Sequence, residues 1–158
     1  MAQSSLCLPF LFASFIVLSY VPPPARANIF GRSQRVRVKG RVFCPSDPGK
    51  ADNVQVKLMD EDDFGIDDKM DEVYTDYEGR FTLDGSAKEI TNIDPELKIY
   101  HDCNDVSRTG IQNKPCQRKW KMKIPDAYIN GNGKYAEFDI GDVNLEIVMK
   151  GESRDCIH

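Results

Sequence analysis

Three side chains that could do covalent chemistry stand next to one another at His101-Asp102-Cys103. A cysteine thiolate beside an imidazole is the nucleophile and base pair of cysteine hydrolases. Neighbouring residues on a strand point to opposite faces, however, and a nucleophilic cysteine needs a free thiol. We therefore expect no catalytic residues here, no enzyme activity elsewhere in the chain, and no cofactor.

Acidic residues are concentrated between positions 60 and 72 in a pattern that partly matches a calcium-binding loop. Asp60, Asp62 and Asp71 take the first, third and twelfth places, and Gly65 takes the sixth. Phe64 stands at the fifth place, where an oxygen ligand belongs, and the twelfth place holds aspartate instead of the longer glutamate. We expect a solvated acidic loop, and calcium binding is the open alternative.

Two segments carry a basic side chain at every second position, so each would line one face of a strand. The first stripe is Arg35, Arg37, Lys39 and Arg41, and the second is Lys119, Lys121 and Lys123. Such stripes can bind phospholipid headgroups, sulfated glycans or an acidic protein surface. The alternative is a solvated sheet face whose like charges discourage aggregation. The sequence leaves open whether both stripes share one sheet.

Tyr100 and Trp120 are two aromatic residues near the second stripe. We expect them to pack within the fold, and a binding role is the alternative.

The formal net charge of the whole chain is −4 at pH 7. Nucleic-acid binding requires a strongly basic surface, so a mildly acidic chain argues against a nucleic-acid partner.

The first 27 residues have the pattern of a secretory signal peptide. Residues 6–21 are almost all apolar, and Pro22-Pro23-Pro24 and the small-x-small motif Ala25-Arg26-Ala27 follow. A membrane anchor is the alternative, but the run is shorter than the roughly 20 residues needed to span a bilayer. We expect cleavage after residue 27 and one exported domain over residues 28–158, with no transmembrane segment.

Four of the five cysteines follow the predicted signal peptide, and an even number in an exported chain predicts two disulfides. Four cysteines allow three pairings. We expect Cys103–Cys116 to close a strand hairpin, which leaves Cys44–Cys156 as the second bridge. A zinc site would need closely spaced ligand pairs such as Cys-x-x-Cys, which are absent.

Short alternating segments predict an all-β fold. Residues 97–102 and 117–124 are expected to form a hairpin, as are residues 73–76 and 80–84 around Gly79. Further strands are predicted at 34–44, 54–58, 135–140 and 143–150, and one turn of helix at 87–90. Eight short strands without a long helical pattern predict a sandwich or barrel.

Several ordered motifs across residues 28–158 resemble the transthyretin-like family of nematodes. They are Gly40-Arg41-Val42-Phe43-Cys44, Asp67-Asp68-Lys69-Met70, Thr75-Asp76-x-x-Gly79-x-Phe81, residues 93–103 from Ile93 to Cys103, and Ile140-Gly141-x-x-Asn144-Leu145-Glu146. The resemblance implies a transthyretin-like, immunoglobulin-like β-sandwich of two antiparallel sheets, an extracellular or cell-surface location, and no settled activity.

Two better-known relatives of this fold suggest functions that must be weighed against these residues. Transthyretin carries small hydrophobic hormones, whereas hydroxyisourate hydrolase ends in Tyr-Arg-Gly-Ser and uses several histidines and arginines. This chain ends Arg154-Asp155-Cys156-Ile157-His158 and has two histidines, so we do not expect that hydrolysis.

Together these patterns predict a secreted binding or signalling module that recognises an extracellular partner protein or an anionic cell surface. The alternative is an extracellular carrier of small hydrophobic ligands. The sequence leaves the identity of the ligand and the oligomeric state open.

Overall fold

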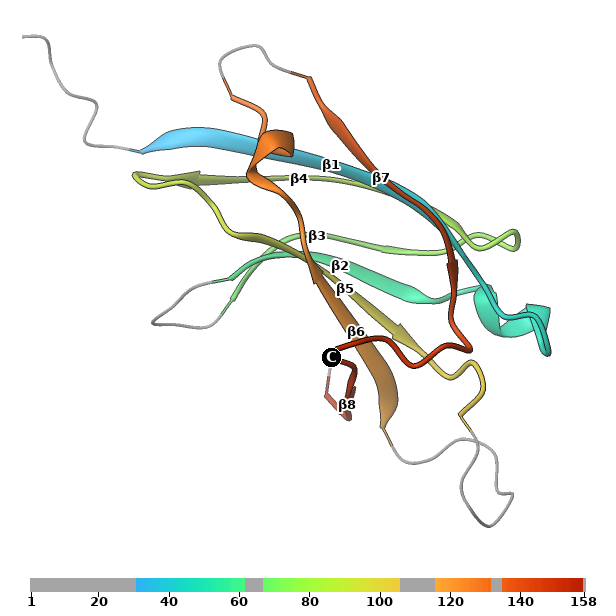
Figure 1. The fold of residues 1–158 in the computed structure, drawn as a ribbon. Coiled ribbons are helices and arrows are strands. Elements are labelled where there is room, and N and C mark those ends of the chain that lie inside the picture. The colour runs from blue at the N-terminus through green and yellow to red at the C-terminus, as the bar shows by residue number, and fades with distance from the viewer. Residues whose placement is uncertain (1–30, 62–66, 106–115, 132–134, 158) are drawn as a thin grey trace, which may run out of the picture.

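The computed structural model describes residues 31–61, 67–105, 116–131 and 135–157 (Figure 1). The predicted signal peptide, residues 1–27, lies outside these ranges. The elements are β1 Arg32–Phe43, η1 Pro48–Ala51, β2 Gln55–Asp60, β3 Asp68–Tyr74, β4 Arg80–Glu89, β5 Pro95–His101, β6 Gln117–Lys123, η2 Asp126–Tyr128, β7 Glu137–Asn144 and β8 Ser153–Asp155, where η marks a 3-10 helix.

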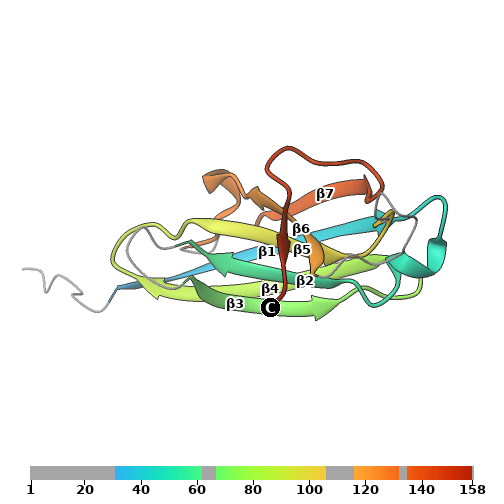
Figure 2. The ribbon, with the colours of Figure 1, turned by 90° about the horizontal axis from the view of Figure 1, so that it is seen from below.

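The strands form two packed sheets, which confirms the predicted all-β sandwich. One sheet has the order β4-β1-β7 and the other the order β3-β2-β5-β6-β8. Seen from below, β3 and β4 lie at one side of the sandwich and β7 at the other (Figure 2). All neighbouring strands are antiparallel except β1 and β7, which are parallel.

Alternating apolar side chains from both sheets fill the space between them. Val36 and Val38 of β1 and Leu83 of β4 are completely buried, in one cluster with Leu58 of β2 and Ile99 of β5. Burial of each such side chain stabilises the fold by about 1.5–3 kcal/mol relative to leaving it in water. The residues between them on each strand therefore point outward, as the sequence pattern predicts.

The predicted hairpin of residues 97–102 and 117–124 is confirmed as the antiparallel pair β5 and β6. Ile99 lies opposite Trp120 and His101 opposite Arg118, and these residues face the inside of the sandwich. The alternate residues, among them Lys119, face outward.

The second predicted hairpin is wrong in its strand pairing, although its turn is present. The Gly79 N–H donates to Asp76 O at 2.8 Å, and Gly79 has the positive φ of +77° that such a turn requires. Beyond the turn the chain changes sheets: β3 pairs with β2, whereas β4 pairs with β1 over its whole length. Because β4 continues to Glu89, the helical turn predicted at 87–90 is also wrong.

The two strands predicted around Gly141 are one strand, β7, and the last strand lies further on, at β8. The register with β1 shifts at this point, because Lys39 lies opposite Asp139 and Arg41 opposite Asp142. Gly141 has a φ of +70°, so the glycine accommodates a β-bulge where the sequence suggested a turn.

The predicted disulfide pairing, Cys44–Cys156 with Cys103–Cys116, is wrong. The structure pairs Cys44 with Cys103 and Cys116 with Cys156, with Cα–Cα distances of 5.9 and 4.1 Å. Cys44 and Cys103 are buried where β1 and β5 end, whereas Cys116 precedes β6. Gln117 lies opposite Asp155 in the β6/β8 pair, so the next residues out, Cys116 and Cys156, meet directly. The pairing could not be predicted from the hairpin alone, because it depends on β8 lying beside β6.

Two glycines with similar backbone conformations separate the cost of a left-handed residue from the cost of a clash. A Cβ on Gly79 would collide with the carbonyl of Val42, whereas a Cβ on Gly141 would meet nothing within 4 Å. Both Gly→Ala changes impose left-handed strain of roughly 1–2 kcal/mol. We expect Gly79→Ala to lower the free energy of unfolding by about 1–3 kcal/mol more than Gly141→Ala, as measured by urea denaturation. Equal losses would contradict the tight packing of this turn against β1.

Candidate functional site

The two basic stripes lie on opposite outer faces of the sandwich. Arg35, Arg37, Lys39 and Arg41 are on β1 in the three-stranded sheet, and Lys119, Lys121 and Lys123 are on β6 in the five-stranded sheet. The structure therefore does not combine them into a single basic surface.

Acidic residues on the neighbouring strands pair with the stripe on β1. Lys39 Nζ lies 2.7 Å from Glu137 Oε1, and this hydrogen bond raises the pKa of the lysine. Arg35 donates to both oxygens of Asp84, and Arg41 Nη1 lies 3.3 Å from Asp142. The stripe is therefore part of a mixed-charge face.

The stripe on β6 is paired in the same way. Lys119 Nζ lies 2.7 Å from Asp155, and Lys121 Nζ lies 3.2 Å from Glu96. Lys123 donates to Glu61 at 2.9 Å, and this bond holds the pKa of Glu61 below its usual value. The cations of this stripe therefore already contact carboxylates of the same protein, which reduces the attraction of the stripe for an anionic surface.

The described flanks of the candidate calcium loop make structural bonds, while residues 62–66 lie outside the described ranges. Asp60 is buried and accepts from the backbone N–H of Asp94 at 2.7 Å. Asp71 accepts from the N–H of Glu72 and from the N–H of Asp84 on the facing sheet. These bonds occupy two carboxylates of the predicted ligand set.

The sulfur of Cys103 is bonded to Cys44, so it is not a free thiol. His101 is buried beside Arg118, and burial together with that cation lowers the pKa of the imidazole to about 4. On the outer face, burial and the nearby Asp155 raise the pKa of the Tyr100 hydroxyl to about 12. Lys57 Nζ lies 5.5 Å from the centre of the Tyr100 ring.

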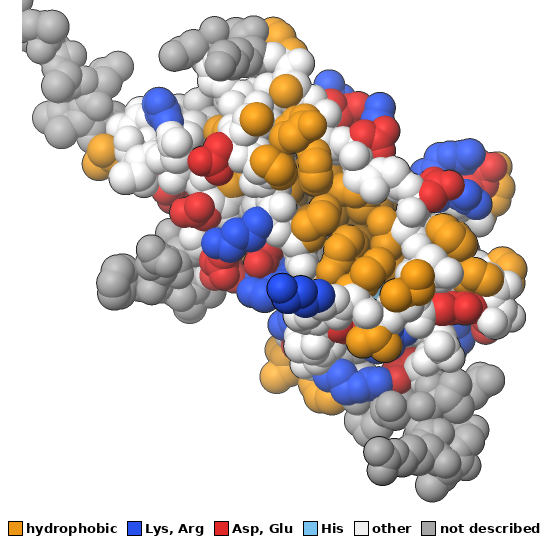
Figure 3. Space-filling model, in the orientation of Figure 1, with side chains coloured by type: hydrophobic (Ala, Val, Ile, Leu, Met, Phe, Trp, Pro, Cys, Tyr) orange, Lys and Arg blue, Asp and Glu red, His pale blue; other side chains and the backbone are white. Residues whose placement is uncertain are grey.

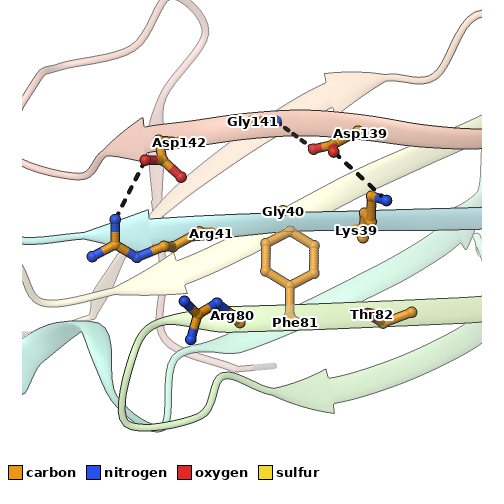
Figure 4. A pocket seen from close by; sticks show the side chains of 9 residues that line it. All are labelled: Lys39, Gly40, Arg41, Arg80, Phe81, Thr82, Asp139, Gly141 and Asp142. Atoms are coloured by element: carbon orange, nitrogen blue, oxygen red, sulfur yellow. Dashed lines mark hydrogen bonds and ion pairs between the residues drawn. The ribbon is translucent and has the colours of Figure 1, made fainter.

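A depression of about 430 Å³ lies where β1, β4 and β7 meet at the bulge (Figure 4). Gly40 and Phe81 lie at its centre, and the ends of charged side chains surround them. These charged residues are Lys39, Arg41, Arg80, Asp139 and Asp142. Because cations and carboxylates alternate and partly pair, the depression does not select a ligand of one charge.

One side of the sandwich, between β7 and β6, exposes apolar side chains. The sheet containing β7 has three strands and the sheet containing β6 has five, so β7 does not cover the inner face of β6 completely. Hydrophobic side chains gather between these two strands in the space-filling view (Figure 3). We call this surface the apolar side. The partly buried apolar residues that β6, η2, β7 and the chain after β7 pack against the core are Trp120, Met122, Tyr128, Ile129, Phe138, Ile140 and Met149.

Comparisons with known proteins agree with this architecture. A model of the transthyretin-like family matches residues 39–125. Transthyretin-like protein 5 of Caenorhabditis elegans is 46% identical over 134 residues, which cover 82% of this chain and 89% of that protein. The chain belongs to the transthyretin-like family. Transthyretin-like protein 2 of the same species is 40% identical over 141 residues, covering 85% of this chain and 90% of that protein.

The family and the transthyretin-like fold predicted from the motifs are thus confirmed. Among solved structures, the 5-hydroxyisourate hydrolase of Klebsiella pneumoniae is 14% identical with a TM-score of 0.40, covering 76% of this chain and 98% of that one. A likeness of this degree says nothing about activity.

Arg118 anchors the C-terminal part of this transthyretin-like chain across the end of the apolar side. Its guanidinium is buried and donates to both oxygens of Glu152, at 2.6 and 2.8 Å. It also donates to the carbonyls of Cys103, Leu145 and Ile147, at 2.7, 2.9 and 3.1 Å. Burial alone would raise the pKa of Glu152, but the bonds from Arg118 and from a backbone N–H lower it.

Sequence reasoning singled out Trp120 but missed the other residues of the apolar side. Alternation predicts that Met122 on β6 and Phe138 and Ile140 on β7 face inward. It does not give the number of strands in each sheet, which decides whether an inward residue is covered. In this transthyretin-like chain the uneven split leaves these residues partly exposed.

The burial of His101 predicts that the folded protein loses stability as the pH falls. Its pKa falls from an ordinary 6.5 to about 4 in the folded protein, so the unfolded chain binds more protons between these values. Stability is therefore fully present above pH 6.5 and decreases toward pH 4, by an amount on the order of 3 kcal/mol. Arg118, Glu152, Asp102 and Asp105 act on the imidazole electrostatically.

The measurement is urea denaturation at several values between pH 7.5 and pH 4, for the wild type and for His101→Gln. The variant lacks the titrating ring but keeps the carboxylates, so the difference between the two curves isolates the histidine. We expect the variant to lose less stability over this interval. Parallel curves would show that His101 is not buried in its neutral form.

Proposed function

We propose that this protein is an extracellular module that binds a partner protein through the apolar side. The observation that carries the proposal is the partly exposed inner surface formed by Trp120 and Met122 of β6 with Phe138 and Ile140 of β7. Contiguous apolar surface on a folded protein marks an interaction site more often than isolated exposed residues do. Aromatic residues and methionine are also enriched at protein interfaces.

The two disulfides support an extracellular location, because disulfides form and persist outside the reducing cytosol. None of the helices in the described part of the chain is long and apolar enough to cross a lipid bilayer. The proposal also assigns no catalytic role to residues 101–103, because the sulfur of Cys103 is bonded to Cys44.

A partner protein fits the surface better than an anionic membrane or glycan does. The cations of both stripes are paired with acids, for example Lys39 with Glu137 and Lys119 with Asp155. An anionic surface would have to compete with these carboxylates at each site.

A partner protein also fits the apolar side better than a small hydrophobic ligand does. Sites for small hydrophobic ligands enclose most of the ligand, whereas the apolar side is open toward solvent.

Two lysine substitutions test the proposal. Met122→Lys places a charge on the apolar side, and Tyr77→Lys places the same charge on a side chain that is 81% exposed at the turn before β4. We expect chemical cross-linking in extracellular fluid to join the wild type and Tyr77→Lys to the same protein, and Met122→Lys to lose that product at least tenfold. The control is circular dichroism, in which both variants should give the spectrum of the folded wild type.

Two other measurements separate the alternatives. Saturable binding of a fluorescent fatty acid, unaffected by salt, with no cross-linked protein would favour the carrier function. Salt-sensitive binding to phosphatidylserine vesicles, lost in Arg37→Glu with Lys39→Glu, would favour recognition of an anionic surface. If Met122→Lys is cross-linked to the partner as strongly as the wild type, the apolar side is not the binding site.

A further inference from the structure

Strand β7 is an edge strand with backbone groups available on one long side. It pairs with β1, and within the described ranges no other strand pairs with it. An edge strand presents unpaired N–H and C=O groups to which another extended chain can hydrogen-bond. The charged residues and the bulge at Gly141 are features that limit such pairing along edges.

The open side of β7 faces the uncovered part of the other sheet. A strand added beside β7 would lie over the inner face of β6, where Trp120 and Met122 are partly exposed. It would therefore extend the backbone hydrogen bonding of β7 and cover the apolar side at the same time. Figure 3 shows the hydrophobic side chains gathered at this position.

We propose that an extended segment of the partner adds to β7 as the fourth strand of the β4-β1-β7 sheet. This inference rests on the proposed function and specifies how the partner is recognised. Main-chain hydrogen bonds supply affinity in such strand addition, and alternate side chains supply specificity. The bulge at Gly141 restricts regular pairing to the first part of β7, so the docking segment is short.

The side chains of β7 define the chemistry of the docking segment. Phe138 and Ile140 face inward, so every second residue of the added strand is apolar. Glu137 faces outward and is paired with Lys39 of β1 at 2.7 Å, whereas the carboxylate of Asp139 lies 3.8 Å from Lys39 and its side chain is 55% exposed. Asp139 is therefore the more accessible acid on this edge. Opposite charges on neighbouring strands attract, so the docking segment carries lysine or arginine at the positions that face outward beside Asp139.

The same charges disfavour a second copy of this chain as the occupant. If β7 paired with β7 of another molecule, Glu137 and Asp139 would lie near the same acidic residues. Like charges directly across a strand pair are destabilising. A partner segment that alternates apolar and basic residues is therefore the occupant that this edge selects.

Trp120 provides the readout, because it is the only tryptophan in the chain. The probe is a capped seven-residue peptide that alternates lysine and valine. Covering the indole should shift its emission to shorter wavelength, in a saturable titration. We expect the matched glutamate/valine peptide to bind at least tenfold more weakly. An absence of binding by the lysine/valine peptide would overturn the proposal.

Backbone methylation tests strand addition itself. In a strand, N–H groups of alternate residues point to opposite edges, so all valine N–H groups lie on one edge and all lysine N–H groups on the other. We expect one of the two peptides, N-methylated at valine or at lysine, to bind like the parent and the other to lose binding. Equal binding by both methylated peptides would show side-chain docking without a fourth strand.

A charge reversal on β7 tests the specificity. Asp139→Lys should weaken the lysine/valine peptide and strengthen the glutamate/valine peptide, each several-fold, whereas Asp52→Lys, at an exposed aspartate after η1, should change neither. An unchanged preference in Asp139→Lys would overturn the predicted chemistry of the segment. A concentration-dependent dimer that shifts Trp120 emission without peptide would make a second copy the occupant and would also overturn it.

The two proposals fail in distinguishable ways. If Met122→Lys loses the cross-linked partner but both methylated peptides bind alike, the partner recognises the apolar side without strand addition. If Met122→Lys keeps the partner, the apolar side is not the site and the proposed function fails.

Discussion

The buried guanidinium of Arg118 is the interaction on which the rest of this structure depends. A charge taken out of water costs several kcal/mol unless its donors are satisfied, and here the carboxylate of Glu152 and three backbone carbonyls satisfy them. Two of those carbonyls, from Leu145 and Ile147, follow β7 directly. The chain after β7 is therefore held across the end of the sandwich and reaches β8 beside β6. Because it does not return along β7, that strand stays an edge and the apolar side stays open.

The pairing of charges on the outer faces and the exposure of apolar side chains between β6 and β7 both favour the apolar side as the binding surface. On both outer faces the cations of one strand meet acids from the next, as Lys39 meets Glu137 and Lys121 meets Glu96. Because their cations are paired, the two basic stripes offer little attraction to an anionic ligand. The apolar side differs, because nothing in the described chain covers Trp120 and Met122 completely. Binding energy from the hydrophobic effect is therefore available there.

Alternation along single strands allowed much of the fold to be predicted, whereas relations between strands were predicted less well. The stripe Arg35, Arg37, Lys39 and Arg41 was correctly predicted to line one face of a strand, and β5 was correctly paired with β6, because both follow from alternation with a period of two in neighbouring segments. The turn at Gly79 was correct, but a turn does not decide whether its strands join one sheet. The disulfides were mispaired because the position of β8 depends on Arg118, which sequence pattern treats as one more basic residue. The apolar side was missed for a different reason: the exposure of Met122 depends on how the strands are divided between the two sheets, which alternation does not give.

The most direct test of the central claim is residue-resolved amide hydrogen exchange across β7 in the protein alone. If β7 is an edge strand held open by the Arg118 anchor, then before the bulge at Gly141 every second N–H, bonded to β1, is protected. The N–H groups between them exchange as fast as solvent-exposed amides. Uniform protection of all the amides of β7 would show that another strand already covers this edge, and would contradict the account.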